Sequence, residues 1–292
     1  MRATHAPGAL PDDLDRPVVV VGAPRCGTTF LATLLGCHPD LAVAHEPRLT
    51  WRYGNDRKSD LLTAVDARPE VRAHIRRNLA SFVHAQSSTR LVEKTPSNSL
   101  RLDFVDAVLP DARYVHVIRD GRDAVASIVQ RWRGEGKTKD SAVERHRLLA
   151  RAREASPRQW LLYAGEAVRR LLPESRLAPP LWGPRLPGMA ALVNEIGVLG
   201  VAALQWRTCI ERARWFGRHF GSRYMEVRLE DLSAEVIAQV VTFAELPDEA
   251  VFQHEFSARF RPSGASRHML TADEHDVVEA WIATTQASLG YQ

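Results

Sequence analysis

Residues 16–35 of the chain read RPVVVVGAPRCGTTFLATLL. Arg16–Gly22 is a run of β-branched residues of the kind that forms a buried strand in a parallel sheet. A loop with a proline and a second glycine follows, and Thr28–Leu35 then predicts a helix. Because a strand, a glycine-containing loop and a helix follow one another, this stretch predicts the phosphate-binding unit of an α/β fold.

The loop itself carries the groups that an anion needs. It consists of Arg25, Cys26, Gly27, Thr28 and Thr29. The glycine allows a tight turn, so that backbone N–H groups at the helix N-terminus can face a phosphate. The arginine adds a positive charge and the two threonines add hydroxyl donors. These groups favour a binding loop over a turn that has only a structural role.

The glycine spacing of this loop resembles that of a nucleoside triphosphatase, but its chemistry differs. Thr28 occupies the position of the lysine that such enzymes place on the β- and γ-phosphates, and the cation lies earlier, at Arg25. We therefore expect a ligand with a shorter 5′ anion and no metal. A P-loop nucleotide kinase, which would need that lysine and Mg²⁺, is the enzyme alternative.

The rest of the chain continues the alternation of strands and helices. Further strands are predicted at Leu41–Ala44, Arg90–Glu93, Arg113–Ile118 and Arg223–Arg228. Further helices are predicted at Pro69–Ala85, Asn98–Leu109, Arg122–Trp132, Ala190–Phe220, Ser233–Phe243 and Thr271–Leu289. Thr271 and Glu274 form a capping-box pattern at the start of the last helix. This order predicts an α/β fold: a P-loop-like, doubly wound parallel sheet flanked by helices.

We expect one domain over residues 1–292. Residues 1–15 are polar and contain prolines, which indicates a loose tail. Residues 135–220 predict a helical insertion: Ser141–Leu172 has a helical pattern, and Pro173–Pro187 is too rich in proline for a regular helix or a central strand.

Composition narrows the class of protein. The net charge is +4, and only four of the 39 basic residues are lysines, a bias that is typical of a GC-rich genome. No reader motif or set of exposed aromatic residues accompanies the arginines, so we do not expect nucleic-acid binding. The three cysteines have no metal-ligand spacing and are too few for a disulfide scaffold, which favours a reducing cytoplasm.

Neither a secretory signal nor a membrane span is predicted. Met1–Arg16 has no apolar segment of the kind that signal peptides contain. The longest apolar stretch, Met189–Leu204, includes Asn194 and Glu195 and is too short to cross a bilayer. It therefore predicts a buried helix.

A second motif lies about ninety residues after the loop. The strand RYVHVI ends at Arg119, a glycine turn follows, and Ser127 comes about two helical turns later. Since the carboxyl ends of parallel strands meet at one edge of a sheet, we expect Arg119 and the Gly27 loop to face the same crevice. Arg119 and Ser127 could then bind a second phosphate. The alternative is a surface ion-pair cluster of Arg119, Asp120, Arg122 and Asp123.

The stretches GAPRCGTTFL and VIRDGRDAVAS resemble the two signatures with which the sulfotransferase superfamily binds 3′-phosphoadenosine 5′-phosphosulfate (PAPS). The elements CHPD, a following Glu, EKTP and IRDGR are especially similar to the tyrosylprotein branch and to the bacterial carbohydrate or small-molecule branches. The resemblance covers residues 17–132 well. It implies a metal-independent α/β transferase that moves the sulfuryl group of PAPS to a hydroxyl group of a carbohydrate, a small molecule or a tyrosine.

The resemblance also implies roles for particular residues. Arg25 to Thr29 would bind the 5′-phosphosulfate, and Arg119 and Ser127 the 3′-phosphate. Arg267 would contribute from a late basic loop at residues 261–267. The chain departs from the family at Leu229, where a tyrosine is common, and it lacks the usual tryptophan before Arg267. Arg228 could take over the contact of the missing tyrosine.

Sulfuryl transfer needs a base for the acceptor hydroxyl and positive charge on the leaving phosphate. Arg25 and Lys94, which follows the strand Arg90–Glu93, are the candidates for the leaving-group side. Glu46 is the candidate base, because the tyrosylprotein branch places a glutamate there; His45 is its rival, because the cytosolic enzymes use a histidine.

The acceptor side is described less well by the sequence. The arginine-rich residues 138–172 and the segment Leu181–Pro184 are expected to border the acceptor, and Trp182 could stack on a ring or belong to the core. The sequence leaves open whether two copies of the chain form a homodimer. The non-enzyme alternative, a nucleotide-binding module with a decayed site, predicts the loss of groups such as Lys94 and Glu46, which are both present.

Overall fold

The structure is a computed structural model that describes residues 14–133, 156–157, 159–160, 181–247, 249–260 and 266–291. Its centre is a parallel sheet of five strands in the order β2-β3-β1-β4-β5. The strands are β1 (Val18–Val21), β2 (Leu41–His45), β3 (Arg90–Lys94), β4 (Arg113–Ile118) and β5 (Tyr224–Arg228). The α/β class with a parallel sheet, predicted from the sequence, is confirmed.

The β1 strand shows why the sheet needs helices on both faces. All four of its valines are fully buried, and side chains alternate between the two faces of a strand. Val18 and Val20 pack in one hydrophobic cluster, while Val19 and Val21 pack in another on the opposite face. A strand that is buried on both faces is typical of parallel sheets in doubly wound folds.

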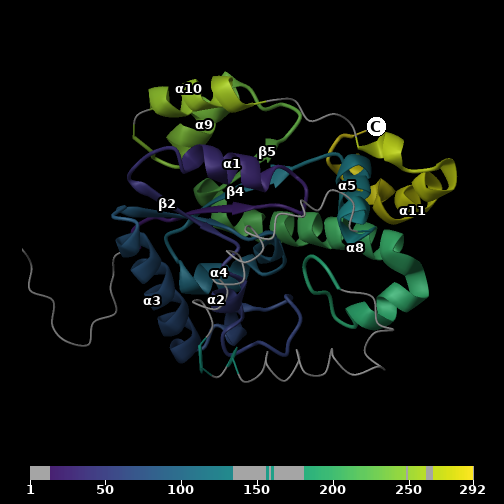
Figure 1. Cartoon of the computed structure of the whole chain (residues 1–292), viewed down its shortest axis with the longest axis horizontal. Coiled ribbons are helices and arrows are strands. Elements are labelled where there is room, and N and C mark those ends of the chain that lie inside the picture. The colour runs from purple at the N-terminus through teal and green to yellow at the C-terminus, as the bar shows by residue number, and fades with distance from the viewer. Residues whose placement is uncertain are drawn as a thin grey trace, which may run out of the picture.

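Two layers of helices provide this cover (Figure 1). One layer consists of α1 (Thr28–Leu35), α9 (Ala234–Phe243) and α10 (Glu249–Arg259). The other contains α2 (Arg48–Arg52), α3 (Pro69–Ala85), α4 (Leu102–Val108) and the long α8 (Met189–Phe220). Beside it, α5 (Gly121–Arg133) and α11 (Ala272–Ser288) pack with α8 around a third cluster. Short 3₁₀ turns lie at η1 (Ala64–Asp66), η2 (Pro96–Leu100), η4 (Gly221–Arg223) and η5 (Arg267–Met269).

Several elements differ from the expected ones. The helix predicted over Asn98–Leu109 is divided into η2 and α4, because Arg101 adopts φ −146° and ψ 42° at the junction. The helices α2 and α10 were not predicted. The capping box of Thr271 and Glu274 is confirmed at the start of α11.

Part of the predicted insertion belongs to the core. The helix α8 forms the last part of residues 135–220. Its Trp206, Cys209 and Ile210 are fully buried in the cluster that α8 shares with α5 and α11. Gly197, at φ 68° and ψ 176°, interrupts its helical geometry. The helical pattern of Ser141–Leu172 and the tail at residues 1–13 lie outside the described residues.

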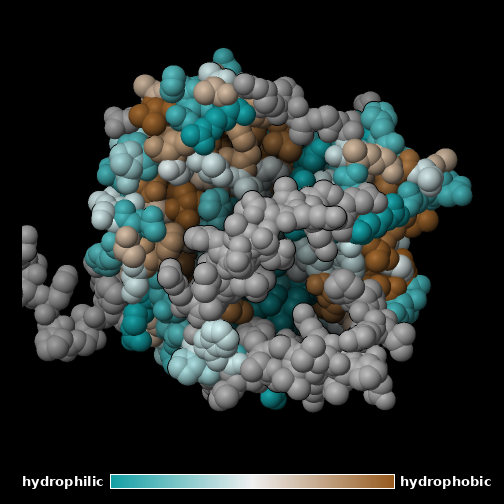
Figure 2. All heavy atoms as spheres, viewed as in Figure 1, coloured by the Kyte–Doolittle hydropathy of each residue, from teal (hydrophilic) through white to brown (hydrophobic). Residues whose placement is uncertain are grey.

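By length and composition alone, Met189–Arg223 could cross a membrane, and 44% of its most apolar window is buried within the protein. Core helices of soluble proteins have the same composition, so this feature does not assign a span. Hydrophobic residues also reach the surface over α1 and β2 and over the first turns of α8, between hydrophilic ones (Figure 2). Scattered apolar surface of this kind is normal for a folded protein.

Candidate active site

The loop between β1 and α1 depends on its two glycines. A side chain at Gly22 would place its Cβ 2.4 Å from the carbonyl oxygen of Val117 on the neighbouring strand. Gly27 has φ 86°, and a Cβ there would lie 2.5 Å from the side chain of Leu229. The distance at Gly22 is too short for any side chain, because the neighbour is a backbone oxygen, and the left-handed φ at Gly27 disfavours a side chain there. The glycines therefore allow the loop to lie close to β4 and to the segment after β5.

Arg25, Arg119 and Ser127 lie together at this edge of the sheet. Arg25 Nε donates a hydrogen bond to Ser127 Oγ at 2.9 Å, and Arg119 Nη1 donates to the carbonyl oxygen of Arg25 at 3.0 Å. Burial lowers the pKa of Arg25, and the nearby charges of Arg119 and Arg131 lower it further. The structure thus brings the two predicted motifs together and concentrates positive charge where they meet.

The other members of the loop have different environments. Cys26 is fully buried, and burial raises the pKa of its thiol to about 12, so the thiol stays protonated. The side chain of Thr28 is nearly buried, whereas Thr29 is exposed at the first turn of α1. Of the two predicted hydroxyl donors, Thr29 is thus the more accessible to a ligand.

The alternative of a surface ion-pair cluster describes only part of the second motif. Arg122 does pair with Asp120 at 3.4 Å and with Glu279 at 3.1 Å. Arg119 does not follow this pattern, because it is nearly buried and points to the loop of Arg25. The cluster and the candidate anion site therefore lie side by side in the same turn.

The sequence did not reveal the residues, distant along the chain, that hold the turn at Asp120 and Gly121 in place. Gln286 of α11 donates to Asp120 Oδ1 at 2.7 Å and accepts a hydrogen bond from the N–H of Gly121 at 2.9 Å. Glu230 accepts from the N–H of Asp120 at 2.9 Å. These contacts join positions more than 100 residues apart, and no local pattern marks them.

Arg267 approaches the same turn from η5. Its backbone N–H donates to Asp123 Oδ1 at 2.8 Å, and its guanidinium lies 3.8 Å from Asp120 Oδ2. The side chain remains 39% exposed, so it retains room to contact a ligand beside Arg119. The rest of the predicted basic loop, residues 261–265, lies outside the described residues.

Glu46 and Lys94 form an ion pair at the carboxyl ends of β2 and β3. Lys94 Nζ lies 2.7 Å from Glu46 Oε1, and Arg48 Nη2 lies 2.5 Å from Oε2. Glu46 also has a left-handed backbone, with φ 53°, which is uncommon outside glycine. Burial alone would raise the pKa of Glu46, but the charges and hydrogen bonds of Arg48 and Lys94 lower it to about 2.

His45 lies in register with Lys94 on the neighbouring strand. Burial of its ring and the positive charge of Lys94 lower the pKa of His45, which keeps the imidazole neutral near pH 7. Both candidates for the base thus lie at the edge that carries Lys94.

The loop after α2 and the segment after residue 180 are joined by buried charges. Asp60 is fully buried, and its Oδ1 lies within 3.4–3.6 Å of guanidinium nitrogens of Arg52, Arg101 and Arg185. Trp182 packs at the edge of the core, and Gln205 donates to its carbonyl oxygen at 2.9 Å. The partial burial of Trp182 agrees with the core interpretation better than with a free stacking platform.

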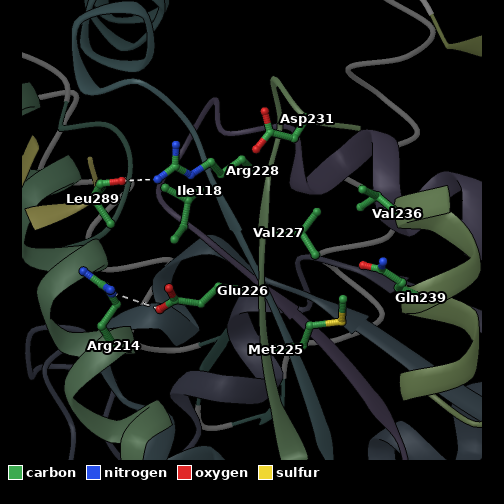
Figure 3. Close-up of a pocket in the computed structure, with 10 residues that line it drawn as sticks. All are labelled: Ile118, Arg214, Met225, Glu226, Val227, Arg228, Asp231, Val236, Gln239 and Leu289. Carbon is green, nitrogen blue, oxygen red and sulfur yellow. Dashed lines mark hydrogen bonds and ion pairs between the residues drawn. The ribbon is translucent and has the colours of Figure 1, made fainter. Parts of the chain in front are cut away.

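A cavity of about 280 Å³ lies elsewhere, at the free edge of β5 (Figure 3). Arg214 and Glu226 form an ion pair at its wall, and Arg228 donates to the carbonyl oxygen of Leu289. Arg228 also lies over the ring of Tyr291. These contacts tie Arg228 to the C-terminal segment. Arg228, suggested from the sequence as a substitute for the missing tyrosine, lines this cavity, and the other candidate site residues do not.

Within the described part of the chain, no group of three or more His, Cys, Asp or Glu side chains is arranged to hold a metal ion. Positive charge at the candidate site comes from arginine and lysine side chains.

Comparison with known proteins agrees with this geometry. The family model described as "Sulfotransferase family" matches residues 17–169, just over half of the chain. The chain is 28% identical over 128 residues to protein-tyrosine sulfotransferase A of Caenorhabditis elegans, a match that covers 39% of this chain and 33% of that protein. It is 26% identical over 129 residues to nodulation protein NoeE of Sinorhizobium fredii, covering 39% and 31%. The chain thus spans about a third of these relatives.

A solved structure supports the fold. Sulfotransferase STF9 from Mycobacterium avium superposes with a TM-score of 0.52 at 16% identity, over 96% of this chain and 78% of that one. These findings favour the sulfotransferase hypothesis over the nucleotide kinase.

Proposed function

The chain belongs to the sulfotransferase family, and we propose that it transfers the sulfuryl group of PAPS to a hydroxyl group of a carbohydrate, a small molecule or a tyrosine. The observation that carries this proposal is the contact between the two motifs, in which Arg25 donates to Ser127 and Arg119 donates to the loop of Arg25. A donor with phosphate groups on both its 5′ and 3′ positions needs two anion sites at one edge of the sheet.

The residues present fit such a donor. Ser127 Oγ accepts a hydrogen bond from Arg25, which leaves its own hydroxyl hydrogen available for a phosphate oxygen. Arg119, beside it, would supply the charge for the 3′-phosphate, and Arg267 lies at the same turn. The backbone of residues 25–29, at the N-terminus of α1, would hold the 5′-phosphosulfate.

PAPS supplies an activated sulfuryl group, which an acceptor hydroxyl attacks in line with the leaving phosphate. The bond from sulfur to the acceptor oxygen forms as the bond to the phosphate oxygen breaks. Arg25 and Lys94 would stabilise the negative charge that develops on the phosphate. The hydroxyl proton must go to a base, for which Glu46 is the candidate.

The ion pair of Glu46 with Lys94 can make the pKa of Glu46 depend on whether the donor is bound. With Lys94 and Arg48 both in contact, a pKa of about 2 makes Glu46 a weak base. An anionic donor competes with Glu46 for Lys94, and the loss of one cationic neighbour raises the pKa of the carboxylate. Proton abstraction would then become effective only when the donor is bound.

We also infer a cytoplasmic location and no metal requirement. All three cysteines, Cys26, Cys37 and Cys209, are free thiols in the structure, and two of them are buried in the core. A protein that keeps its cysteines free is suited to a reducing compartment.

The proposal is tested by incubating the protein with ³⁵S-labelled PAPS and a panel of sugars, phenols and tyrosine peptides, with EDTA present. We expect label to appear on at least one class of acceptor and to disappear in the Glu46→Gln variant. Release of label to water alone, at the same rate in both proteins and with every acceptor, would contradict the assignment.

A further inference from the structure

Glu93 lies beside the candidate active site, near the end of β3, and its side chain is fully buried. Trp51 Nε1 donates to its Oε1 at 2.9 Å, and the hydroxyl of Thr95 donates to the same oxygen at 2.5 Å. Asn98 Nδ2 donates to the other oxygen at 3.0 Å. A buried carboxylate that accepts three hydrogen bonds is held in one position, and it fixes its donors in turn.

These donors come from the elements that carry the candidate catalytic groups. Trp51 belongs to α2, which begins two residues after Glu46. Thr95 follows Lys94 directly in the chain. Glu93 therefore connects the two segments whose side chains form the ion pair of Glu46 and Lys94.

The network continues away from the site into a rigid part of the core. Asn98 Oδ1 accepts a hydrogen bond from Arg101 Nε at 2.9 Å, and Arg101 Nη1 lies 3.6 Å from Asp60. Glu93, Asn98, Arg101 and Asp60 are each at most 1% exposed. A chain of buried polar groups with defined partners tolerates little displacement.

We propose that Glu93 is a positioning residue that holds Lys94 in place for the donor phosphate and for Glu46. This inference rests on the proposed function, because it assigns Lys94 to the 5′ side of PAPS. Glu93 itself touches neither ligand nor reacting atoms and acts through its neighbour.

The ionised form of Glu93 is the one that fits its partners. A protonated carboxyl group is a weaker acceptor and must place its own hydrogen among these donors, so the hydrogen bonds of Trp51, Thr95 and Asn98 would be weakened or reversed. Burial raises the pKa of Glu93 to about 7, although these hydrogen bonds and the charge of Arg101 lower it in part. Positioning should thus be nearly complete at pH 8, about half lost at pH 7 and largely lost at pH 6.

Binding of 3′-phosphoadenosine 5′-phosphate, measured by calorimetry at pH 8 with EDTA, tests this role without an acceptor. Glu93→Gln keeps an oxygen for two donors but turns an NH₂ group toward Asn98. We expect Lys94→Ala to weaken binding about tenfold and Glu93→Gln several-fold. The double variant should bind within about twofold of Lys94→Ala, because residues that act as a unit are not additive.

Effects that multiply in the double variant, or wild-type affinity in Glu93→Gln, would overturn the proposal. A wild-type protein that does not bind the nucleotide would instead refute the proposed function. Tyr114→Phe is the matched control: it removes one buried hydroxyl of the same core, bonded to Asp106, and should leave affinity unchanged. If Glu93→Gln does not fold, Trp51→Phe removes a single donor and should show the same non-additivity.

A second readout separates positioning from a general structural role. The ratio of wild-type to Glu93→Gln affinity should fall toward one as the pH is lowered from 8 to 6, because the wild-type protein then loses the ionised carboxylate. A ratio that stays constant over this range would contradict the role of the ionised form.

Discussion

The two halves of the candidate site differ in how their charges are balanced. At the ends of β1 and β4, Arg25 and Arg119 lie close together, and the partner of Arg25 is the neutral Ser127. At the ends of β2 and β3, Lys94 is matched by the carboxylate of Glu46. Cations that pair with no carboxylate among the described residues indicate a site for an anionic ligand, whereas a matched pair indicates groups that exchange partners or protons. We propose that the first edge binds the donor, and that the second carries proton transfer and adds Lys94 to the leaving phosphate.

We expect the largest effect from Glu46→Gln, which tests whether the β2–β3 edge carries the base. We expect sulfuryl transfer to fall by roughly 10²–10⁴, the usual contribution of a general base, while affinity for 3′-phosphoadenosine 5′-phosphate does not weaken. Glu245→Gln is a matched control, because Glu245 also has a positive φ and contacts two arginines, Arg16 and Arg113. Normal transfer in Glu46→Gln would remove Glu46 from this role and direct attention to His45.

The second test concerns the buried charges below the β2–β3 edge. Asp60→Asn leaves Arg101 buried without its carboxylate, and removing one partner of a buried ion pair costs about 3–5 kcal/mol. Denaturant unfolding should show this loss in the free energy of unfolding. Arg207→Ala, which breaks an exposed pair with Glu211, should change stability by less than about 0.5 kcal/mol. Equal losses of stability in Asp60→Asn and Arg207→Ala would mean that the buried charges of Asp60 and Arg101 do not stabilise the protein near β2 and β3.

A third test uses the pH dependence of stability. The pKa of Glu93 is raised to about 7 in the folded protein, so the folded state binds more protons than the unfolded state between about pH 4.5 and 7. The free energy of unfolding should therefore fall as the pH rises through this range, by up to about 3 kcal/mol. Glu93→Gln should remove this part of the slope, and an unchanged slope would contradict the account.

The variant Arg119→Ala tests the edge at the ends of β1 and β4. Loss of a charge-assisted contact should weaken binding of 3′-phosphoadenosine 5′-phosphate about 10–100-fold and leave the affinity for AMP nearly unchanged. Arg122→Ala, from the same turn, should have the smaller effect, because Arg122 pairs with Glu279. Equal losses for both nucleotides would show that Arg119 does not read the 3′-phosphate.

The same contrast explains what the sequence could predict. Thr28–Leu35, Pro69–Ala85 and Arg113–Ile118 have the bounds expected from local patterns, and Arg25, Arg119 and Ser127 meet as parallel strands require. Each of these features depends on a few neighbouring residues or on one topological rule.

The remaining features depend on partners far along the chain. The hydrogen bond from Trp51 to Glu93 and that from Gln286 to Asp120 have no local signature. Helix propensity also does not reveal the break at Arg101, whose side chain lies in a buried cluster with Asp60. Tertiary contacts override local preference at these positions.

The most direct test of the central claim is a calorimetric titration of the wild-type protein with 3′-phosphoadenosine 5′-phosphate in EDTA, beside AMP and ATP–Mg²⁺. We expect tight binding that requires the 3′-phosphate and needs no metal. Binding of ATP–Mg²⁺ together with indifference to the 3′-phosphate would contradict it.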